Sequence, residues 1–290
     1  MPGAGFRIGG LAGAGHDGPG APRHRLSANT VQAQIDKAHR RLAIGRLDDA
    51  AHLYESVLAA EPDHAQALFG RGRVAVRQGK PEEGLPYLAR ALELCPGQGL
   101  FHEGMGEACL AQGKTEAAKA HFEAAVAADP GLASGWLRLG RMLWAEGATA
   151  KAESCFKLAV AHAPFEPSHH FALAEILDET GNRAGAEVRL RKVLALDPIH
   201  AEAHARLGEI LLANDRPGHA IDHFDQALAG QPDRPDWLCA LARTWLAFGD
   251  PDMAGQALER ALELDPHSSE ARALRDAIGP SGPPDPEDGT

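Results

Sequence analysis

The sequence has no run of about 18 apolar residues, the length that a helix needs to cross a bilayer. The segment before residue 29 also lacks the apolar centre of a secretory signal, because glycine, alanine and proline dominate it. Aromatic residues make up only 5% of the 290 residues although 44% are hydrophobic, so the apolar content is mainly alanine and leucine. This composition predicts helices packed through small side chains, and we expect a cytoplasmic protein without membrane insertion.

Cysteine is scarce as well. The four cysteines, Cys95, Cys109, Cys155 and Cys239, lie far apart and form no C-x-x-C spacing. That pattern argues against a disulfide-stapled secreted domain and against a cysteine zinc site. We expect buried, reduced thiols.

Basic residues are too few for a nucleic-acid-binding protein. Lysine and arginine total 29 against 40 acidic residues, which gives a formal net charge of −11. Phosphate binding requires a dense basic surface, so we expect no nucleic-acid partner. The charge is uneven, because residues 1–46 contain seven basic residues and only two acidic ones.

Proline, in contrast, is regularly placed. Seven prolines follow one another at intervals of 34 residues: Pro62, Pro96, Pro130, Pro164, Pro198, Pro232 and Pro266. A fixed period of this length is the signature of a tandem repeat. With the proline at position 32, the repeats are 31–64, 65–98, 99–132, 133–166, 167–200, 201–234 and 235–268.

Four further positions keep one character in every repeat. Positions 8 and 20 hold only glycine or alanine, position 24 holds a bulky apolar residue, and position 15 is glycine except at Asp215. Small residues let two antiparallel helices approach, and the bulky residue fills the space beside them. Glycine ends the first helix in the left-handed conformation, and proline ends the second. Each repeat is therefore predicted to be a helix pair that buries its apolar face only by stacking.

The fourth repeat resembles the tetratricopeptide pattern W-x2-L-G-x2-Y…A-x3-F…P through Trp136, Leu139, Gly140, Leu143, Ala152, Phe156 and Pro164. The resemblance covers residues 31–268 and implies an all-α solenoid of antiparallel helix pairs with a right-handed superhelix. His102, His170 and His204 stand where the family has Trp or Leu, which we expect to loosen three repeats slightly.

The ends of the array are also predicted. Residues 269–279 have an apolar stripe of Ala271, Leu274 and Ile278 and no second helix after them, which indicates a capping helix. The array with this cap is expected over residues 29–279. Segments 1–28 and 280–290 are rich in glycine and proline, the latter also in acidic residues, and they are expected to be disordered.

No motif indicates catalysis, a cofactor or a metal. The G-x-G-x-x-G of Gly13, Gly15 and Gly18 lacks the strand and the helix that a dinucleotide site needs. His219 and His223, one helical turn apart, are expected to be an exposed pair, and we cannot assemble the three or four ligands of a zinc site around them. The sequence therefore predicts a protein that is not an enzyme.

The resemblance implies that the first helices of the repeats line a groove for a peptide or a helix. The family positions that reach the ligand predict a groove with apolar anchors and charges of both signs: Phe69, Arg73, Glu107, Leu137, Arg138, Arg141, Trp144, Phe171, Glu175, Asp178, Arg206, Glu209 and Arg243. The alternative is that these charges pair with one another across neighbouring repeats. Neither the carboxylate clamp of chaperone-binding relatives nor the asparagine ladder of sugar-transferase relatives is present at positions 5 and 6.

Three hypotheses about function follow from this groove. The first is a non-catalytic scaffold or adaptor that binds a segment of one or more protein partners. The second is an accessory or regulatory subunit that acts in trans on a transferase-type enzyme. The third is self-association, with the capping helix or the C-terminal tail docking into a neighbouring copy.

Overall fold

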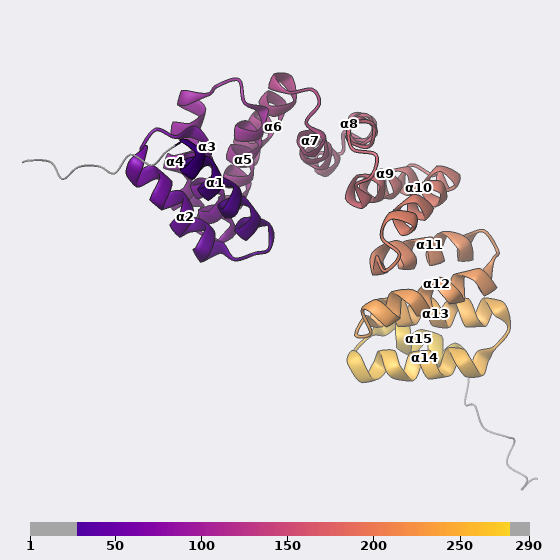
Figure 1. The fold of residues 1–290 in the computed structure, drawn as a ribbon. Coiled ribbons are helices and arrows are strands. Elements are labelled where there is room, and N and C mark those ends of the chain that lie inside the picture. Colours follow the sequence, from indigo (N-terminus) through magenta and orange to yellow (C-terminus); the bar gives the residue numbers. More distant parts are fainter. Residues whose placement is uncertain (1–27, 279–290) are drawn as a thin grey trace, which may run out of the picture. The chain divides into compact units, whose positions relative to one another are not determined.

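The computed structural model describes residues 28–278, and this part of the chain contains fifteen α-helices and no strand (Figure 1). The helices are α1 (Ala28–Ala43), α2 (Leu47–Ala60), α3 (Ala65–Arg77), α4 (Pro81–Leu94), α5 (Gly99–Ala111), α6 (Thr115–Ala128), α7 (Ala133–Ala145), α8 (Thr149–His162), α9 (Pro167–Glu179), α10 (Arg183–Leu196), α11 (Ala201–Ala213), α12 (Pro217–Gly230), α13 (Pro235–Phe248), α14 (Pro251–Leu264) and α15 (Ser269–Ile278). The all-α helical repeat is confirmed. The segments expected to be disordered lie outside the described residues, except for Ala28, which begins α1.

The seven predicted repeats correspond to seven helix pairs, from α1 and α2 to α13 and α14. The helix α15 lies within the segment 269–279, where a capping helix is expected, and it contacts both helices of the last pair. The chain divides into two compact units. The first contains α1–α4, the second contains α6–α15, and α5 contributes residues to both.

The first unit is built around residues of its first two helix pairs. Ile35, Tyr54 and Val57 are completely buried in one apolar cluster. A Cβ added at Gly70 would come within 2.2 Å of the Tyr54 ring, so the ring fits only because this position has no side chain.

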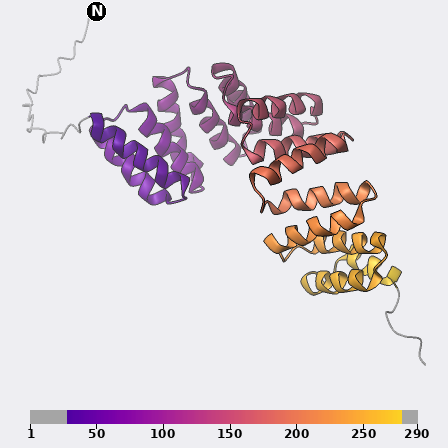
Figure 2. The same ribbon diagram turned by 45° about the vertical axis from the view of Figure 1, so that its right-hand side comes forward.

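In the second unit each helix packs against the next along the chain, and Figure 2 shows the orange and yellow helices lying in succession. First helices also touch one another, as α11 touches α13 and α13 touches α15. From α8 to α14 each second helix contacts the first helix before it and the one after it, as α12 contacts α11 and α13. The first helices therefore form one row and the second helices another.

The small and bulky positions interlock as the sequence predicts. The residue at position 24 is at most 1% exposed in all seven repeats. A Cβ added at Gly140 would lie 2.6 Å from Cε1 of Phe156, and the same clash recurs between Gly106 and Phe122. Real Cβ atoms essentially never come this close to another heavy atom, so in these two repeats glycine at position 8 is what lets the ring lie under the first helix.

The turn between the helices of a repeat needs a left-handed backbone. All six glycines at position 15 have positive φ, between 72° and 99°. Asp215 takes the seventh place with φ of 56°, the one positive value at a non-glycine residue within the described chain.

The position-32 proline contributes its carbonyl to the next repeat. Trp136 Nε1 donates to the Pro130 carbonyl over 2.8 Å, and the Nε2 atoms of His170 and His204 lie 3.0 and 3.1 Å from the carbonyls of the corresponding prolines. Histidine at this position thus keeps the donor that tryptophan supplies. Both histidines are buried.

Candidate functional site

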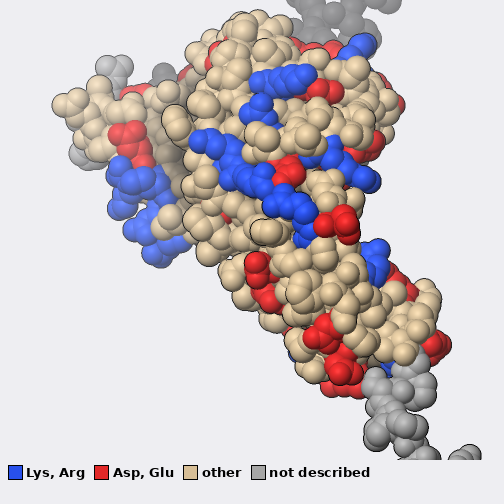
Figure 3. Space-filling model, turned by 90° about the vertical axis from the view of Figure 1, so that its right-hand side faces the viewer, with Lys and Arg blue, Asp and Glu red and all other residues tan. Residues whose placement is uncertain are grey.

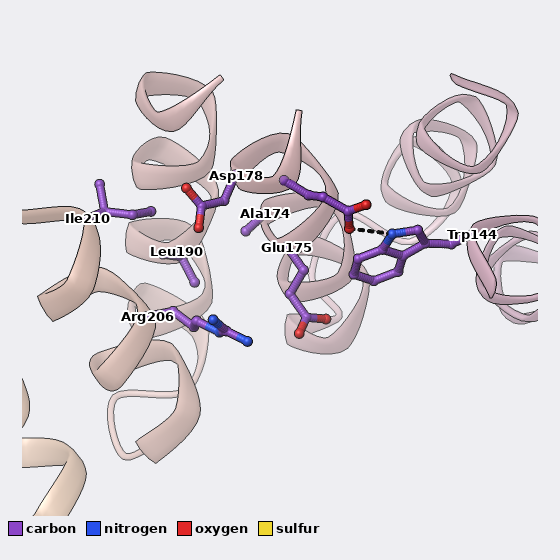
Figure 4. A pocket seen from close by; sticks show the side chains of 8 residues that line it. Trp144, Ala174, Glu175, Asp178, Leu190, Arg206 and Ile210 are labelled. Carbon is purple, nitrogen blue, oxygen red and sulfur yellow. Dashed lines mark hydrogen bonds between the residues drawn. The ribbon is translucent and has the colours of Figure 1, made fainter. Parts of the chain in front are cut away.

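A pocket of about 250 Å³ opens on the row of first helices in the second unit. Helices α7, α9 and α11 form its walls, and α10 contributes one residue to its floor (Figure 4). We call it the α9 pocket. It is lined by Trp144, Ala174, Glu175, Asp178, Glu179, Leu190, Arg206 and Ile210.

The carboxylates of the α9 pocket come from one helix. Glu175, Asp178 and Glu179 are spaced i, i+3 and i+4, which places them on one face of α9. Figure 4 shows Glu175 and Asp178 projecting from α9, with the Trp144 ring and Arg206 on opposite sides of Glu175. The floor is apolar, because Ala174, Leu190 and Ile210 belong to the core.

The Trp144 side chain is held from two directions. Its Nε1–H donates to Glu179 Oε2 over 2.6 Å, across from α7 to α9. Its ring meets the buried Phe156 ring edge to face, with 6.1 Å between the centroids. An indole fixed in this way is a rigid wall with an exposed flank, which suits the binding of a side chain.

The charges of the α9 pocket are incompletely balanced. Arg206 is the one basic lining residue, and its guanidinium lies 3.2 Å from Glu209. Asp178 has a weak partner in Arg183 at 3.8 Å. Burial raises the pKa of Glu175, while Arg206, Arg141 and His200 oppose the rise. Glu175 forms no ion pair with any described residue, so its carboxylate is available to a cation.

Four of the thirteen predicted groove residues, Trp144, Glu175, Asp178 and Arg206, line the α9 pocket. Three others lie near it, since Arg141 acts on Glu175, Glu209 pairs with Arg206, and Phe171 stacks on His200 with ring centroids 5.0 Å apart. Leu137 and Arg138 are half-buried on α7.

The remaining four predicted residues lie elsewhere. Phe69 is only 5% exposed in the first unit, so its ring offers little surface to a ligand. The Arg73 guanidinium lies over that ring at 5.5 Å and 4.0 Å from Glu107. Arg243 lies 3.6 Å from Glu270 of the capping helix. Arg73 and Glu107 therefore pair with each other across neighbouring repeats, whereas Arg243 pairs with a residue outside the predicted set.

Sequence reasoning left four lining residues out of the predicted set. Glu179 is at position 13, which is among the family's ligand positions, so the pattern could have included it. Ala174, Leu190 and Ile210 occupy core positions, and only the packing of α10 against α9 and α11 exposes them to the pocket.

Four of the histidines form two pairs. His204 Nδ1 lies 2.9 Å from His223 Nδ1, and His102 and His121 repeat this contact at 3.4 Å. His223 is half-buried, so the expectation of an exposed pair with His219 is wrong for His223. Within residues 28–278 no group of three or more His, Cys, Asp or Glu side chains is arranged to hold a metal ion.

The four cysteines are free thiols. Cys109, Cys155 and Cys239 are buried as expected, but Cys95 is only half-buried, so the expectation is wrong for that residue. Burial raises the pKa of Cys155 and of Cys239. Among the described helices none is both long and apolar enough to cross a membrane.

Family models for the tetratricopeptide repeat match residues 35–99, 104–167, 171–235 and 211–278, which together are most of the chain. This chain belongs to the tetratricopeptide repeat family. No protein with a curated description matches the sequence significantly.

Solved structures of other tetratricopeptide repeat proteins share this fold. The structure of pilF from Pseudomonas aeruginosa matches with a TM-score of 0.67 and 19% identity, over 73% of this chain and 97% of that one. YrrB, described as a TPR protein with an unusual peptide-binding site, matches with a TM-score of 0.59 and 16% identity, over 65% and 97%. TTC0263 from Thermus thermophilus matches with a TM-score of 0.54 and 24% identity, over 63% and 99%.

Proposed function

We propose that this tetratricopeptide repeat protein is a non-catalytic interaction module that binds an extended segment of a partner protein along α7, α9 and α11. The observation that carries the proposal is the α9 pocket, in which a fixed indole, an apolar floor and three carboxylates surround space for one side chain. Tetratricopeptide repeats in general bind proteins or peptides, and YrrB is described as having a peptide-binding site.

The pocket chemistry favours a lysine or arginine side chain of the partner. Three lining carboxylates face one lining guanidinium, and that guanidinium already has Glu209 as a partner. An aliphatic stem would lie on Ala174, Leu190 and Ile210 while its cation reaches the carboxylates. The flank of Trp144 adds a cation–π contact, which contributes about 0.5–2 kcal/mol.

Selection from a random peptide library tests this function. We expect selected peptides to share a lysine or arginine and to bind the Trp144→Ala variant about tenfold more weakly, which corresponds to about 1.4 kcal/mol. The matched control is Trp245→Ala, which removes a half-buried indole from α13 of the same unit. Equal losses in both variants, or selected peptides without a basic residue, would contradict the proposal.

A further inference from the structure

The second helices of the repeats differ in charge at one place in the array. The helices α2, α4, α6, α12 and α14 each contain more acidic than basic residues. Only α8 and α10 are reversed: α10 has four basic residues against Glu187, and α8 has Lys151 and Lys157 against Glu153. These two helices are consecutive in the row of second helices, so their charges form one local feature.

Position 25 shows the reversal most clearly. It is Glu55, Glu123, Asp225 and Glu259 in four repeats and alanine in a fifth, but Lys157 in α8 and Arg191 in α10. The Lys157 side chain is 62% exposed and that of Arg191 is 52% exposed. The same position thus points to solvent in both helices, and we call this surface the α8–α10 basic face.

Carboxylates within the α8–α10 basic face neutralise only part of its charge. Glu187 is only 13% exposed and is shared by Arg191 and Arg216, while Glu153 lies 2.7 Å from Lys157. Lys192 lies over the Phe165 ring, with 5.8 Å from its Nζ to the centroid. Figure 3 shows a band of Lys and Arg side chains across the middle of the face in view, in a protein whose net charge is −11.

Apolar side chains are exposed among these cations. Val188 on α10 is 62% exposed and precedes Arg191 and Lys192 by three and four residues, which puts all three on one helical face. Leu158 on α8 is 38% exposed, and Phe165 in the loop between α8 and α9 is 75% exposed. The α8–α10 basic face therefore combines positive charge with exposed apolar surface.

These features select one kind of occupant. A 14-residue helix is about 21 Å long, so the face is short, and the second helices on either side of it are acidic. A long nucleic acid or an anionic bilayer would extend beyond the face and meet those carboxylates. A short acidic peptide covers only the cations, and apolar residues within it would cover Val188 and Leu158.

We propose that the α8–α10 basic face is a second binding surface, and that its ligand is a short acidic segment of a partner protein with apolar residues among its carboxylates. It lies on the row of second helices, whereas the α9 pocket opens on the row of first helices. A protein with both surfaces connects two partners.

The test uses the full chain and a labelled peptide of about ten residues, in which Asp and Glu alternate with Leu and Val. We expect binding that weakens steeply as salt rises from about 50 to 300 mM, since exposed charges are screened over a Debye length. The double variant Lys157→Gln/Arg191→Gln should bind at least tenfold more weakly. Its matched control is Arg90→Gln/Arg260→Gln, which removes two cations from α4 and α14 with side chains 46% and 52% exposed.

The proposal is overturned if the peptide does not bind, if the control variant loses as much affinity, or if a single-stranded oligonucleotide or phosphatidylserine vesicles bind more tightly than the peptide. Both glutamine variants should keep the wild-type circular dichroism spectrum, because every substituted residue is exposed. The Trp144→Ala variant should bind the acidic peptide normally, so failure of the α9 pocket and failure of this surface are distinguishable.

Discussion

At the scale of single residues, Asp215 is the clearest departure from the repeat. Every other described repeat has glycine at this turn, because a left-handed backbone brings the Cβ of an L-residue close to the following carbonyl. Aspartate tolerates this left-handed conformation better than most residues, but the conformation still strains its backbone and lowers the stability of the fold. A single substitution at this turn should therefore increase the stability of the fold.

We predict that Asp215→Gly raises the free energy of unfolding by about 0.5–1 kcal/mol, because the strain of the side chain is removed. The opposite change at the corresponding turn, Gly181→Asp at φ of 81°, should lower it. Urea denaturation of both variants measures the two changes. A lower free energy of unfolding in Asp215→Gly would contradict the prediction, because interactions of the aspartate side chain would then stabilise the fold by more than the backbone strain destabilises it.

The histidine pairs make stability depend on pH. His204 Nε2 points to the Pro198 carbonyl, so it donates, and His204 Nδ1 then accepts from His223 Nδ1. A proton on both rings would set two N–H groups against each other. Burial, followed by the charge of His204, lowers the pKa of His223 below its ordinary 6.5, and burial also lowers the pKa of His121 and His170.

Because these folded-state pKa values are lowered, the unfolded chain takes up protons first as the pH falls. Their contribution to stability is present well above pH 6.5, the ordinary pKa of the unfolded chain, and is lost progressively as the pH falls through that value towards the lowered folded-state pKa. We predict that the free energy of unfolding falls between about pH 7.5 and 5.5, and that His223→Asn makes this fall shallower. Urea titrations at several pH values measure it, and a slope unchanged by the substitution would refute the assignment.

At the scale of the helix pair, stability depends on close approach at position 8. Gly140→Ala would put a methyl group against the Phe156 ring, and overpacking of this kind costs about 1–3 kcal/mol. The control is Gly255→Ala in α14, where an added Cβ meets nothing within 4 Å. We predict that the control gains about 0.5–1 kcal/mol from reduced chain entropy. Thermal unfolding measures both changes, and a shift of the Tm in the same direction in both variants would contradict the account.

The sequence predicted this level of structure well, because the cause of each feature is local. A turn glycine, a stop proline and a small residue opposite a large one act within 34 residues, so their period locates every described helix pair. The α9 pocket was harder to predict. Leu190 and Ile210 are core residues that line it only because α9, α10 and α11 pack together, and Phe69 is buried at a position that reaches the ligand in the family.

At the scale of the whole molecule, the proposals give the second unit two binding surfaces of opposite character. The α9 pocket presents carboxylates on the row of first helices, and the α8–α10 basic face presents cations on the row of second helices. Repeats permit this division, since each helix row can vary its solvent-facing positions while the interlocking positions 8, 20 and 24 keep the fold.

A double-mutant cycle across the α9 pocket tests the central claim most directly. Calorimetry would combine the wild-type protein and Glu175→Gln with a library-selected peptide and its version in which norleucine replaces the basic residue. We predict a coupling energy of about 1 kcal/mol or more, as for residues in contact. If the two changes reduce the binding free energy additively, so that the coupling energy is near zero, the account is contradicted, because the basic side chain would then bind away from Glu175.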